Sequence, residues 1–411
     1  MADNIKNWYD FTLLQMAAES YLHDLSLAND ADVKGRLIKG NVFPGKPEGS
    51  SSTRMSGKQA DYFLGQFEIV AHHKNDESGF SGTLFRNKST GEYTLSMRST
   101  EYRYQTDGGD WERDGLRGAD GQVGAYGFAF AQIDHMDKFY QLLKQGKNSS
   151  GNDDPSLTAF KNVMNAGGKI NVTGYSLSGN LSTVLTNLHS GDVQHAYNFN
   201  AAGIGSVYKN TSFTRMLNFY REVLADPRRF SPHDPTDKQY SIYTGALAES
   251  GPIVTDPNAP DANEYLSRRV QWAAEATSRN FGTIYPIPGT VKPVGPITQL
   301  YGHATHDDTE YVANGGYHVK PIPIFIEDQP DLTGFGGFFG QSGDFGTTHS
   351  ITLIADSLAL MSLFQEIDGN LNQRKIEAIF AAASNRRAHG GFFGGNGEYD
   401  SLENALDARN R

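Results

Sequence analysis

The sequence predicts an α/β fold in which a mostly parallel central sheet is flanked by helices. Two observations lead to this prediction. β-branched and aromatic runs alternate with helical patterns over much of the chain, which is typical of strand–helix–strand units. In addition, an apolar run at residues 169–173 ends in a Gly/Ser turn that leads directly into a helical segment. Each expected element is justified below in chain order.

Composition excludes several classes of protein. The 411 residues are enough to bury a sizeable core. The formal net charge is −11, from 36 Lys and Arg against 47 Asp and Glu, which argues against a nucleic-acid partner. The chain has no cysteine, so disulfides, a thiolate nucleophile and a Cys-ligated metal are excluded. The sequence contains no run of about 18 apolar residues, so no transmembrane segment is expected.

The first third of the chain predicts a helix followed by strands. Apolar spacing at residues 8–27 indicates an opening amphipathic helix, and a Gly/Pro/Ser-rich loop follows at 40–57. Three strands are expected next, at residues 67–72, 82–86 and 93–98. We expect an N-terminal segment, residues 1–66, to pack on a catalytic domain spanning 67–411.

Helices and strands alternate in the rest of the chain. Helical patterns occur at residues 128–143, 157–166, 180–189, 213–224, 263–276 and 350–361. Strand patterns occur at residues 169–173, 196–200, 239–244 and 321–326, and another proline-punctuated run at 284–294. Segments around 206–238 and 257–320 are interpreted as insertions into the sheet.

The turn between the predicted strand and helix has the sequence Gly-Tyr-Ser-Leu-Ser-Gly, at residues 174–179. A nucleophile elbow requires this context, because a sharp turn exposes the serine hydroxyl and the helix N-terminus stabilises a developing oxyanion. We therefore predict Ser176 as a nucleophile. The alternative is an ordinary Gly/Ser loop between a strand and a helix.

A serine nucleophile needs a histidine base that is itself oriented by a carboxylate. In α/β hydrolases the catalytic residues follow one another along the chain in the order Ser, acid, His. The best base in that order is His349, which follows the strand at 321–326 and precedes a helix. The alternative is that His349 only caps that helix. Two acids follow the strand at 239–244: Glu249 is nearer the strand end and Asp256 is the commoner residue type. Both remain candidates.

An oxyanion hole needs two backbone N–H donors. One is expected from Leu177, the residue after the nucleophile, and the other from Thr100, at the end of the strand at 93–98.

Three motifs resemble those of a known family. Residues 97–100 (Met-Arg-Ser-Thr) are similar to the family motif Phe-Arg-Gly-Thr/Ser. Residues 172–179 (Val-Thr-Gly-Tyr-Ser-Leu-Ser-Gly) are similar to Val-Thr-Gly-His-Ser-Leu-Gly-Gly. Residues 197–205 (Tyr-Asn-Phe-Asn-Ala-Ala-Gly-Ile-Gly) are similar to Tyr-Thr-Phe-Gly-x-Pro-x-Val-Gly. With these motifs the chain resembles the class 3 lipases, triacylglycerol lipases and phospholipases with an α/β-hydrolase fold. The resemblance extends over residues 80–360 and implies that fold for this chain.

The chain also departs from the family pattern. Tyr175 stands in place of His, and Ser178 and Ser99 each stand in place of Gly. The family's acid lies in an Asn-Asp-Pro-Val segment, and the similar residues 250–253 carry Gly251 at that position. The segment after Thr100, where the family has its lid, is polar, which would suit a substrate with a polar head group.

The resemblance implies a serine hydrolase of carboxylic esters, a lipase or phospholipase A1 that forms an acyl-enzyme. The alternatives are a soluble-ester or polyester hydrolase, and a catalytically inactive scaffold that serves as a binding module. The expected partner is a lipid or ester, and a Gly/Phe-rich loop at 332–346 either packs on the core or contacts a lipid surface.

We expect no cofactor and no metal, and the chain lacks the Gly/Asp-rich repeats that would support a calcium requirement. The motifs are similar to those of bacterial secreted lipases and phospholipases A1 without Sec signals, and residues 1–8 show no such signal. The resemblance therefore implies secretion by a Sec-independent route; otherwise the protein is cytoplasmic.

Overall fold

One mixed sheet organises the protein. The computed structural model describes residues 5–23, 25, 27, 29–41, 53–101, 110–115, 119–120, 123, 128–202, 221, 297–303, 322–325 and 350–383. Within these ranges the strands lie in the spatial order of the sequence: β1 (Phe67–His73), β2 (Gly82–Asn87), β3 (Tyr93–Met97), β4 (Ile170–Tyr175), β5 (Val193–Phe199), β6 (Ile297–His303) and β7 (Ile322–Phe325). β1 to β3 pair antiparallel, and each pair from β3 to β7 is parallel.

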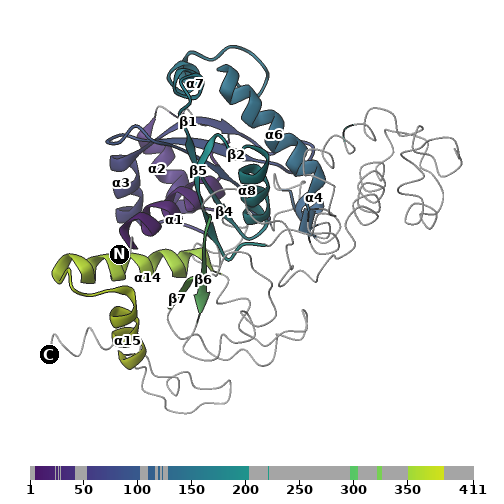
Figure 1. Ribbon diagram of the computed structural model, residues 1–411. Helices are drawn as coiled ribbons and strands as arrows, with labels where there is room; N and C mark the ends of the chain where they lie inside the picture. Colours follow the sequence, from purple (N-terminus) through teal and green to yellow (C-terminus); the bar gives the residue numbers. More distant parts are fainter. Residues whose placement is uncertain are drawn as a thin grey trace, which may run out of the picture.

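Helices cover both faces of the sheet, as Figure 1 shows. The described helices are α1 (Ile5–Glu19), α2 (Asp30–Lys39), α3 (Gly57–Gln66), α4 (Trp111–Asp114), α6 (Phe130–Gln145), α7 (Thr158–Asn165), α8 (Leu177–Leu188), α14 (Ile351–Ile367) and α15 (Gln373–Ala383), with a 3₁₀ turn, η2, at Pro155–Leu157. The prediction of an α/β fold with a mixed sheet and flanking helices is confirmed.

The topology explains which helices share a face. β3 reaches β4 through α6 and α7, and β4 reaches β5 through α8. Right-handed crossovers that advance in one direction along a sheet place their helices on the same face. Accordingly α6, α7 and α8 share one hydrophobic cluster with the sheet, and α1, α3, α14 and α15 share another. The result is a three-layer arrangement with one apolar core on each face.

The opening helix differs from its prediction. α1 ends at Glu19 rather than near residue 27, and it is buried on most of its surface instead of being amphipathic. It packs against both α14 and the sheet, and a helix covered on two sides has no broad solvent face. The polar side chains of Gln15 and Glu19 are buried with it.

Most other elements match their predictions within a few residues; α8, for example, begins at Leu177, three residues before the predicted start. Four helices, α2, α3, α4 and α15, were not predicted. Ser56 and Gln59 form a capping box at the start of α3, a signal that the sequence contains. β6 lies just beyond the proline-punctuated run at 284–294.

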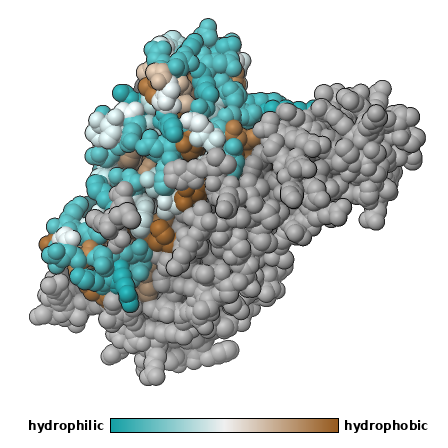
Figure 2. Space-filling model, viewed as in Figure 1, coloured by the Kyte–Doolittle hydropathy of each residue, from teal (hydrophilic) through white to brown (hydrophobic). Residues whose placement is uncertain are grey.

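Several predictions lie outside the described residues. These are the strand at 239–244, the helix at 263–276, the helix at 213–224 apart from Arg221, and most of both insertions. None of the described helices is long and apolar enough to cross a membrane. In Figure 2 the described surface is mostly hydrophilic, with small hydrophobic patches. Its exposed large apolar side chains are Ile38, Val163, Leu363, Ile367 and Ile379.

Candidate active site

Ser176 alone forms the turn between β4 and α8. Its backbone has φ 50° and ψ −120°, a conformation that residues with a Cβ rarely adopt and that costs about 1–3 kcal/mol. Among the described residues other than glycine, only Asn200 also has a positive φ, at 42°. Such strain persists only where the surrounding structure enforces it. A sharp, strained turn from strand to helix is the geometry of a nucleophile elbow.

Backbone hydrogen bonds hold this turn. The Ser176 amide donates to the carbonyl of Phe199 at 3.2 Å. The Ser176 carbonyl accepts from the amides of Gly179 at 3.0 Å and Ala202 at 2.8 Å. The turn is therefore tied both to its own helix and to the end of β5, which explains how the strained conformation is maintained.

Two glycines permit the close approaches that the turn requires. A Cβ at Gly174 would lie 2.3 Å from the backbone oxygen of Ser178. A Cβ at Gly179 would lie 2.2 Å from the Cβ of Ala201, beyond the end of β5. Neither position has room for a larger residue, since real Cβ atoms do not approach so closely.

Ser178, which stands where the family has glycine, closes the turn with its side chain. Its hydroxyl accepts from the Tyr175 amide at 2.8 Å and donates to the Tyr175 carbonyl at 2.9 Å. It also accepts from Gln15 Nε2 at 3.3 Å. The departure from the family motif therefore has a structural reason: this serine links the elbow to α1.

The residues predicted to supply the oxyanion donors lie beyond the same ends of the parallel strands as Ser176. β3 and β4 are parallel, with Ser96 opposite Thr173, so Thr100 and Ser176 each follow a few residues beyond that register. Leu177 is the first residue of α8, where backbone amides have no partner within the helix. The structure thus brings Ser176, Leu177 and Thr100 to one rim of the sheet.

Gln15 of α1 connects the parts of this rim. It is fully buried. Its side chain bonds to Glu19 Oε1 (2.7 Å), the Met97 carbonyl (2.8 Å), Ser96 Oγ (2.9 Å), Thr173 Oγ1 (3.3 Å) and Ser178 Oγ (3.3 Å). These partners lie on α1, β3, β4 and the elbow, so one side chain fixes the relative positions of the nucleophile turn and the neighbouring strand.

Glu19 extends this network to the loop that carries Thr100. Its Oε1 accepts from the Ser99 amide at 3.0 Å. Burial raises the pKa of Glu19 to about 7, although Arg98, Gln15 and the Ser99 amide act in the opposite direction. The loop that carries Thr100 is therefore held by a carboxyl group that titrates near neutral pH.

Acidic side chains also contact the loop that carries Thr100. Arg98 and Glu101 form an ion pair at 3.1 Å in which the two side chains are 3% and 2% exposed. The Thr100 hydroxyl donates to Asp120 at 2.9 Å, and burial raises the pKa of Asp120 to about 7. Arg98 and Glu101 are thus buried beside the loop, and Asp120 is partly buried.

Two acids of the polar segment after Thr100 are described by the structure and lie in the interior. Asp110 and Asp114 are buried. The Asp114 carboxylate accepts from the Glu101 amide at 2.9 Å and from Gln132 Nε2 at 2.7 Å. These two acids therefore lie in the interior, and most of the rest of the polar segment, including residues 102–109, lies outside the described residues.

The predicted base and both predicted acids, His349, Glu249 and Asp256, lie outside the described residues. The structure does describe the helix that follows His349. Its N-cap is Ser350, whose hydroxyl accepts from the Leu353 amide. The alternative interpretation of His349 as the cap of this helix is therefore wrong.

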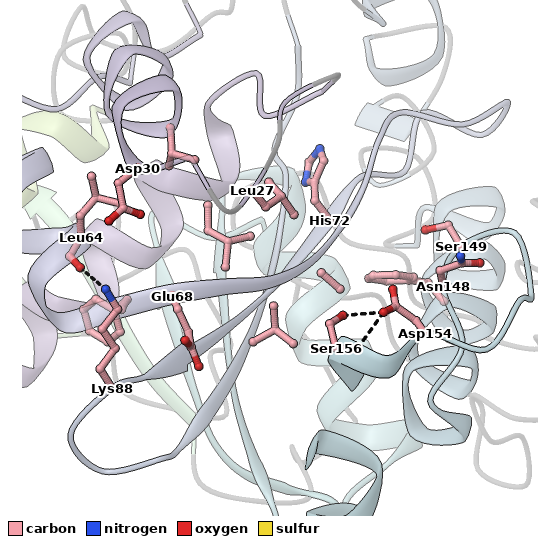
Figure 3. Close-up of a pocket in the computed structure, with 16 residues that line it drawn as sticks. Leu27, Asp30, Leu64, Glu68, His72, Lys88, Asn148, Ser149, Asp154 and Ser156 are labelled. Atoms are coloured by element: carbon pink, nitrogen blue, oxygen red, sulfur yellow. Dashed lines mark hydrogen bonds between the residues drawn. The ribbon is translucent and has the colours of Figure 1, made fainter. Parts of the chain in front are cut away.

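A cavity of about 660 Å³ lies along β1, the edge strand of the described sheet. Figure 3 shows Glu68 and His72 of β1 on its wall, with Asp154 and its hydrogen-bond partner Ser156 nearby. Ser176 does not line this cavity, which is separated from β4 by β2 and β3. It is distinct from the elbow site.

Sequence reasoning missed Gln15 and Glu19. A signal was present, because these two polar residues lie four apart within an otherwise apolar helical run. Residues at i and i+4 lie on the same helix face, and polar groups on a buried face require hydrogen-bond partners. What the sequence alone does not give is the identity of those partners, which are distant along the chain.

Comparisons with known proteins identify no family for the chain. No protein-family model matches the sequence, and no curated protein shows significant similarity to it. The resemblance to the class 3 lipases therefore rests on the motif residues quoted above.

Proposed function

We propose that the protein is a serine hydrolase of carboxylic esters, a lipase or phospholipase A1 that acts on lipid esters. The observation that carries this proposal is the strained backbone of Ser176, at φ 50° and ψ −120°, between a parallel strand and a helix N-terminus. A simple Gly/Ser loop has no need of that strain. An elbow does, because the turn presents the hydroxyl to a substrate.

In the proposed reaction Ser176 attacks the ester carbonyl while His349 accepts the hydroxyl proton. Glu249 or Asp256 orients the imidazole. The tetrahedral intermediate collapses when His349 donates that proton to the alkoxide, and the alcohol leaves. Water, deprotonated by His349, then attacks the acyl-enzyme. The bond between Ser176 Oγ and the acyl carbon breaks, His349 returns the proton to Oγ, and the fatty acid leaves.

The negative charge that develops on the carbonyl oxygen is stabilised by backbone donors. The amides of Leu177 and Thr100 are assigned this role, with the positive end of the α8 dipole behind them. The contacts of Gln15 and Glu19 support this assignment, because they fix the elbow and the loop to one another. Preorganised donors of this kind are worth about 10²–10³ in rate each.

The test combines covalent labelling with product analysis. A fluorophosphonate should label the full-length protein at Ser176, as located by peptide mass spectrometry. Ser176→Ala should abolish the label and lower ester turnover by several orders of magnitude. Ser89→Ala is the control, since Ser89 is an exposed turn serine. Label absent from Ser176, or turnover reduced less than about tenfold in Ser176→Ala, would contradict the proposal and favour a binding module.

Release of fatty acid from phosphatidylcholine and triolein would rank the two lipid classes. A soluble-ester or polyester hydrolase uses the same chemistry, and comparison of micellar with monomeric short-chain esters separates it from a lipase. A preference for the micellar form would support the lipid assignment.

A further inference from the structure

Two histidines and two acids converge between the β1–β2 connection and α6. His73 Nε2 and His135 Nδ1 each lie 2.8 Å from the same oxygen, Asp76 Oδ2. One possible ligand atom from each of Asp76, Glu77 and His135 lies within 4.8 Å of the others. Three of these residues are close in sequence and the fourth comes from a separate helix, so the fold itself assembles the cluster.

Neighbouring groups orient the donors. The other carboxylate oxygen of Asp76 accepts from the Ser78 amide at 2.9 Å and from the Ser78 hydroxyl at 2.6 Å. The His73 ring packs against Phe80 and Phe139, with centroids 5.4 and 5.0 Å apart. Supporting contacts of this kind hold ligand side chains in place in metal sites.

We propose that His73, Asp76, Glu77 and His135 bind one divalent ion of the Zn²⁺ class. Two imidazoles and two carboxylates match the nitrogen and oxygen ligands that Zn²⁺ takes in four-coordinate sites. Ca²⁺ prefers six to eight oxygen ligands, which this cluster does not offer. The site is independent of the proposed hydrolase activity, because none of its residues belongs to the elbow or the oxyanion loop.

The spacing is compatible with an ion after a small movement. The 2.8 Å separations are hydrogen-bond distances. Ligand atoms about 2.0–2.1 Å from Zn²⁺ in a tetrahedron lie about 3.3 Å apart, so these donors must separate by about 0.5 Å. The ion takes the place of the protons on the two imidazole nitrogens. Glu77, whose side chain is 79% exposed, has room to rotate towards the ion as the fourth ligand.

The location gives the ion a structural role. The His73 carbonyl accepts from the Ser81 hydroxyl at 2.8 Å, and the Ser81 carbonyl accepts from the Arg98 amide at 2.9 Å. An ion that ties His73 to His135 therefore links α6 to the end of β1 and, through Ser81, to Arg98 at the end of β3. Binding to the folded state alone raises the melting temperature.

Titration of the full-length protein with Zn²⁺ tests the site. After treatment with a chelator, the protein should bind one Zn²⁺ per chain by isothermal titration calorimetry, and its melting temperature should rise by several degrees when ZnCl₂ is added. CaCl₂ should do neither. Absence of stoichiometric Zn²⁺ binding, or equally tight binding of Ca²⁺, would overturn the proposal and leave a hydrogen-bonded His–Asp–His cluster.

Three variants localise the binding. His135→Gln should abolish it, and Glu77→Gln should weaken it about tenfold or more without affecting folding, since Glu77 is exposed. His189→Gln is the matched control, because His189 is similarly buried and pairs with Asp137 of the same helix, α6, outside the cluster. The proposal fails if His135→Gln or Glu77→Gln binds as tightly as wild type, or if His189→Gln loses binding to the same extent.

Discussion

Two polar networks flank the loop that follows β3, and they differ in how their groups are satisfied. On the α1 side, the amide of Gln15 uses its nitrogen and its oxygen, with partners at 2.7–3.3 Å. On the α6 side, Asp110 Oδ2 and Gln132 Oε1 are buried without a hydrogen-bond partner among the described residues. The network around Gln15 fixes the position of the turn at Ser176 relative to β3. The network beside α6 contains more carboxylates than its arginines can neutralise.

The difference has an electrostatic origin. The acids Glu101, Asp110, Asp114 and Asp120 interact with one another, and Arg98 and Arg113 are the cations among them. Arg98 also interacts with Glu19 of α1. Burial raises the pKa of Asp110 to about 7, with Arg113 opposing the shift. A neutral amide network holds its shape at any pH, but a buried carboxylate cluster changes its charge within the physiological range. The turn at Ser176 is therefore held by neutral groups, and Glu19 is the titrating member of the same network.

The largest expected effect comes from crowding the elbow. In Gly174→Ala the new Cβ would lie 2.3 Å from a backbone oxygen. We expect the free energy of unfolding to fall by roughly 2–3 kcal/mol and fluorophosphonate labelling to be lost. Gly65→Ala in α3 is the control, because no atom lies within 4 Å of its Cβ. It should be neutral or stabilising by about 0.5–1 kcal/mol. Urea unfolding of both variants checks this, and wild-type stability in Gly174→Ala would contradict it.

The next effect comes from removing the side-chain amide of Gln15, which joins β3 and β4 to the turn at Ser176. Gln15→Met keeps the side-chain volume but leaves the Met97 carbonyl, Ser96 and other buried partners unsatisfied. We expect a loss of about 2–3 kcal/mol and slower labelling of Ser176 at equal protein concentration. Gln66→Met, at the end of α3, should change neither quantity. An unchanged labelling rate in Gln15→Met would show that the network does not position the nucleophile.

A pH-dependent effect of comparable size is expected from Glu19. Its pKa is about 7 in the folded protein against a model-peptide value of 4.5. A raised pKa means that its contribution to stability is fully present below about pH 4.5 and is lost as the pH rises through about 7. The contribution is at most about 3 kcal/mol.

The comparison with Glu19→Gln isolates this contribution, because all other titrating groups are common to both proteins. Wild type should lose more stability than Glu19→Gln between pH 5 and 8 by urea denaturation. Asp120→Asn should behave in the same way, since the pKa of Asp120 is also about 7. Parallel curves for wild type and both variants would refute the idea that these acids titrate near neutrality.

Local signals account for the parts of the fold that the sequence predicts. The strands β1 to β3 and the turn at Ser176 follow from alternation and from Gly/Ser chemistry, which depend on near neighbours. The burial of α1 depends instead on α14, more than 300 residues later. The same is true of Glu19, whose partner Ser99 is 80 residues away. Contacts of this kind are set by the tertiary fold, and one sequence holds no local trace of them.

The smallest expected effect comes from replacing Ser178 with glycine, the residue of the similar lipase motif. Ser178→Gly removes the hydroxyl that bonds to both backbone groups of Tyr175, but the backbone bonds of Ser176 remain. We expect a loss of about 1 kcal/mol, with labelling of Ser176 retained at a lower rate. Complete loss of labelling would mean that this serine, rather than the backbone network, maintains the strained turn. A fully wild-type rate would mean that the link from Ser178 to Gln15 contributes nothing to the position of the nucleophile.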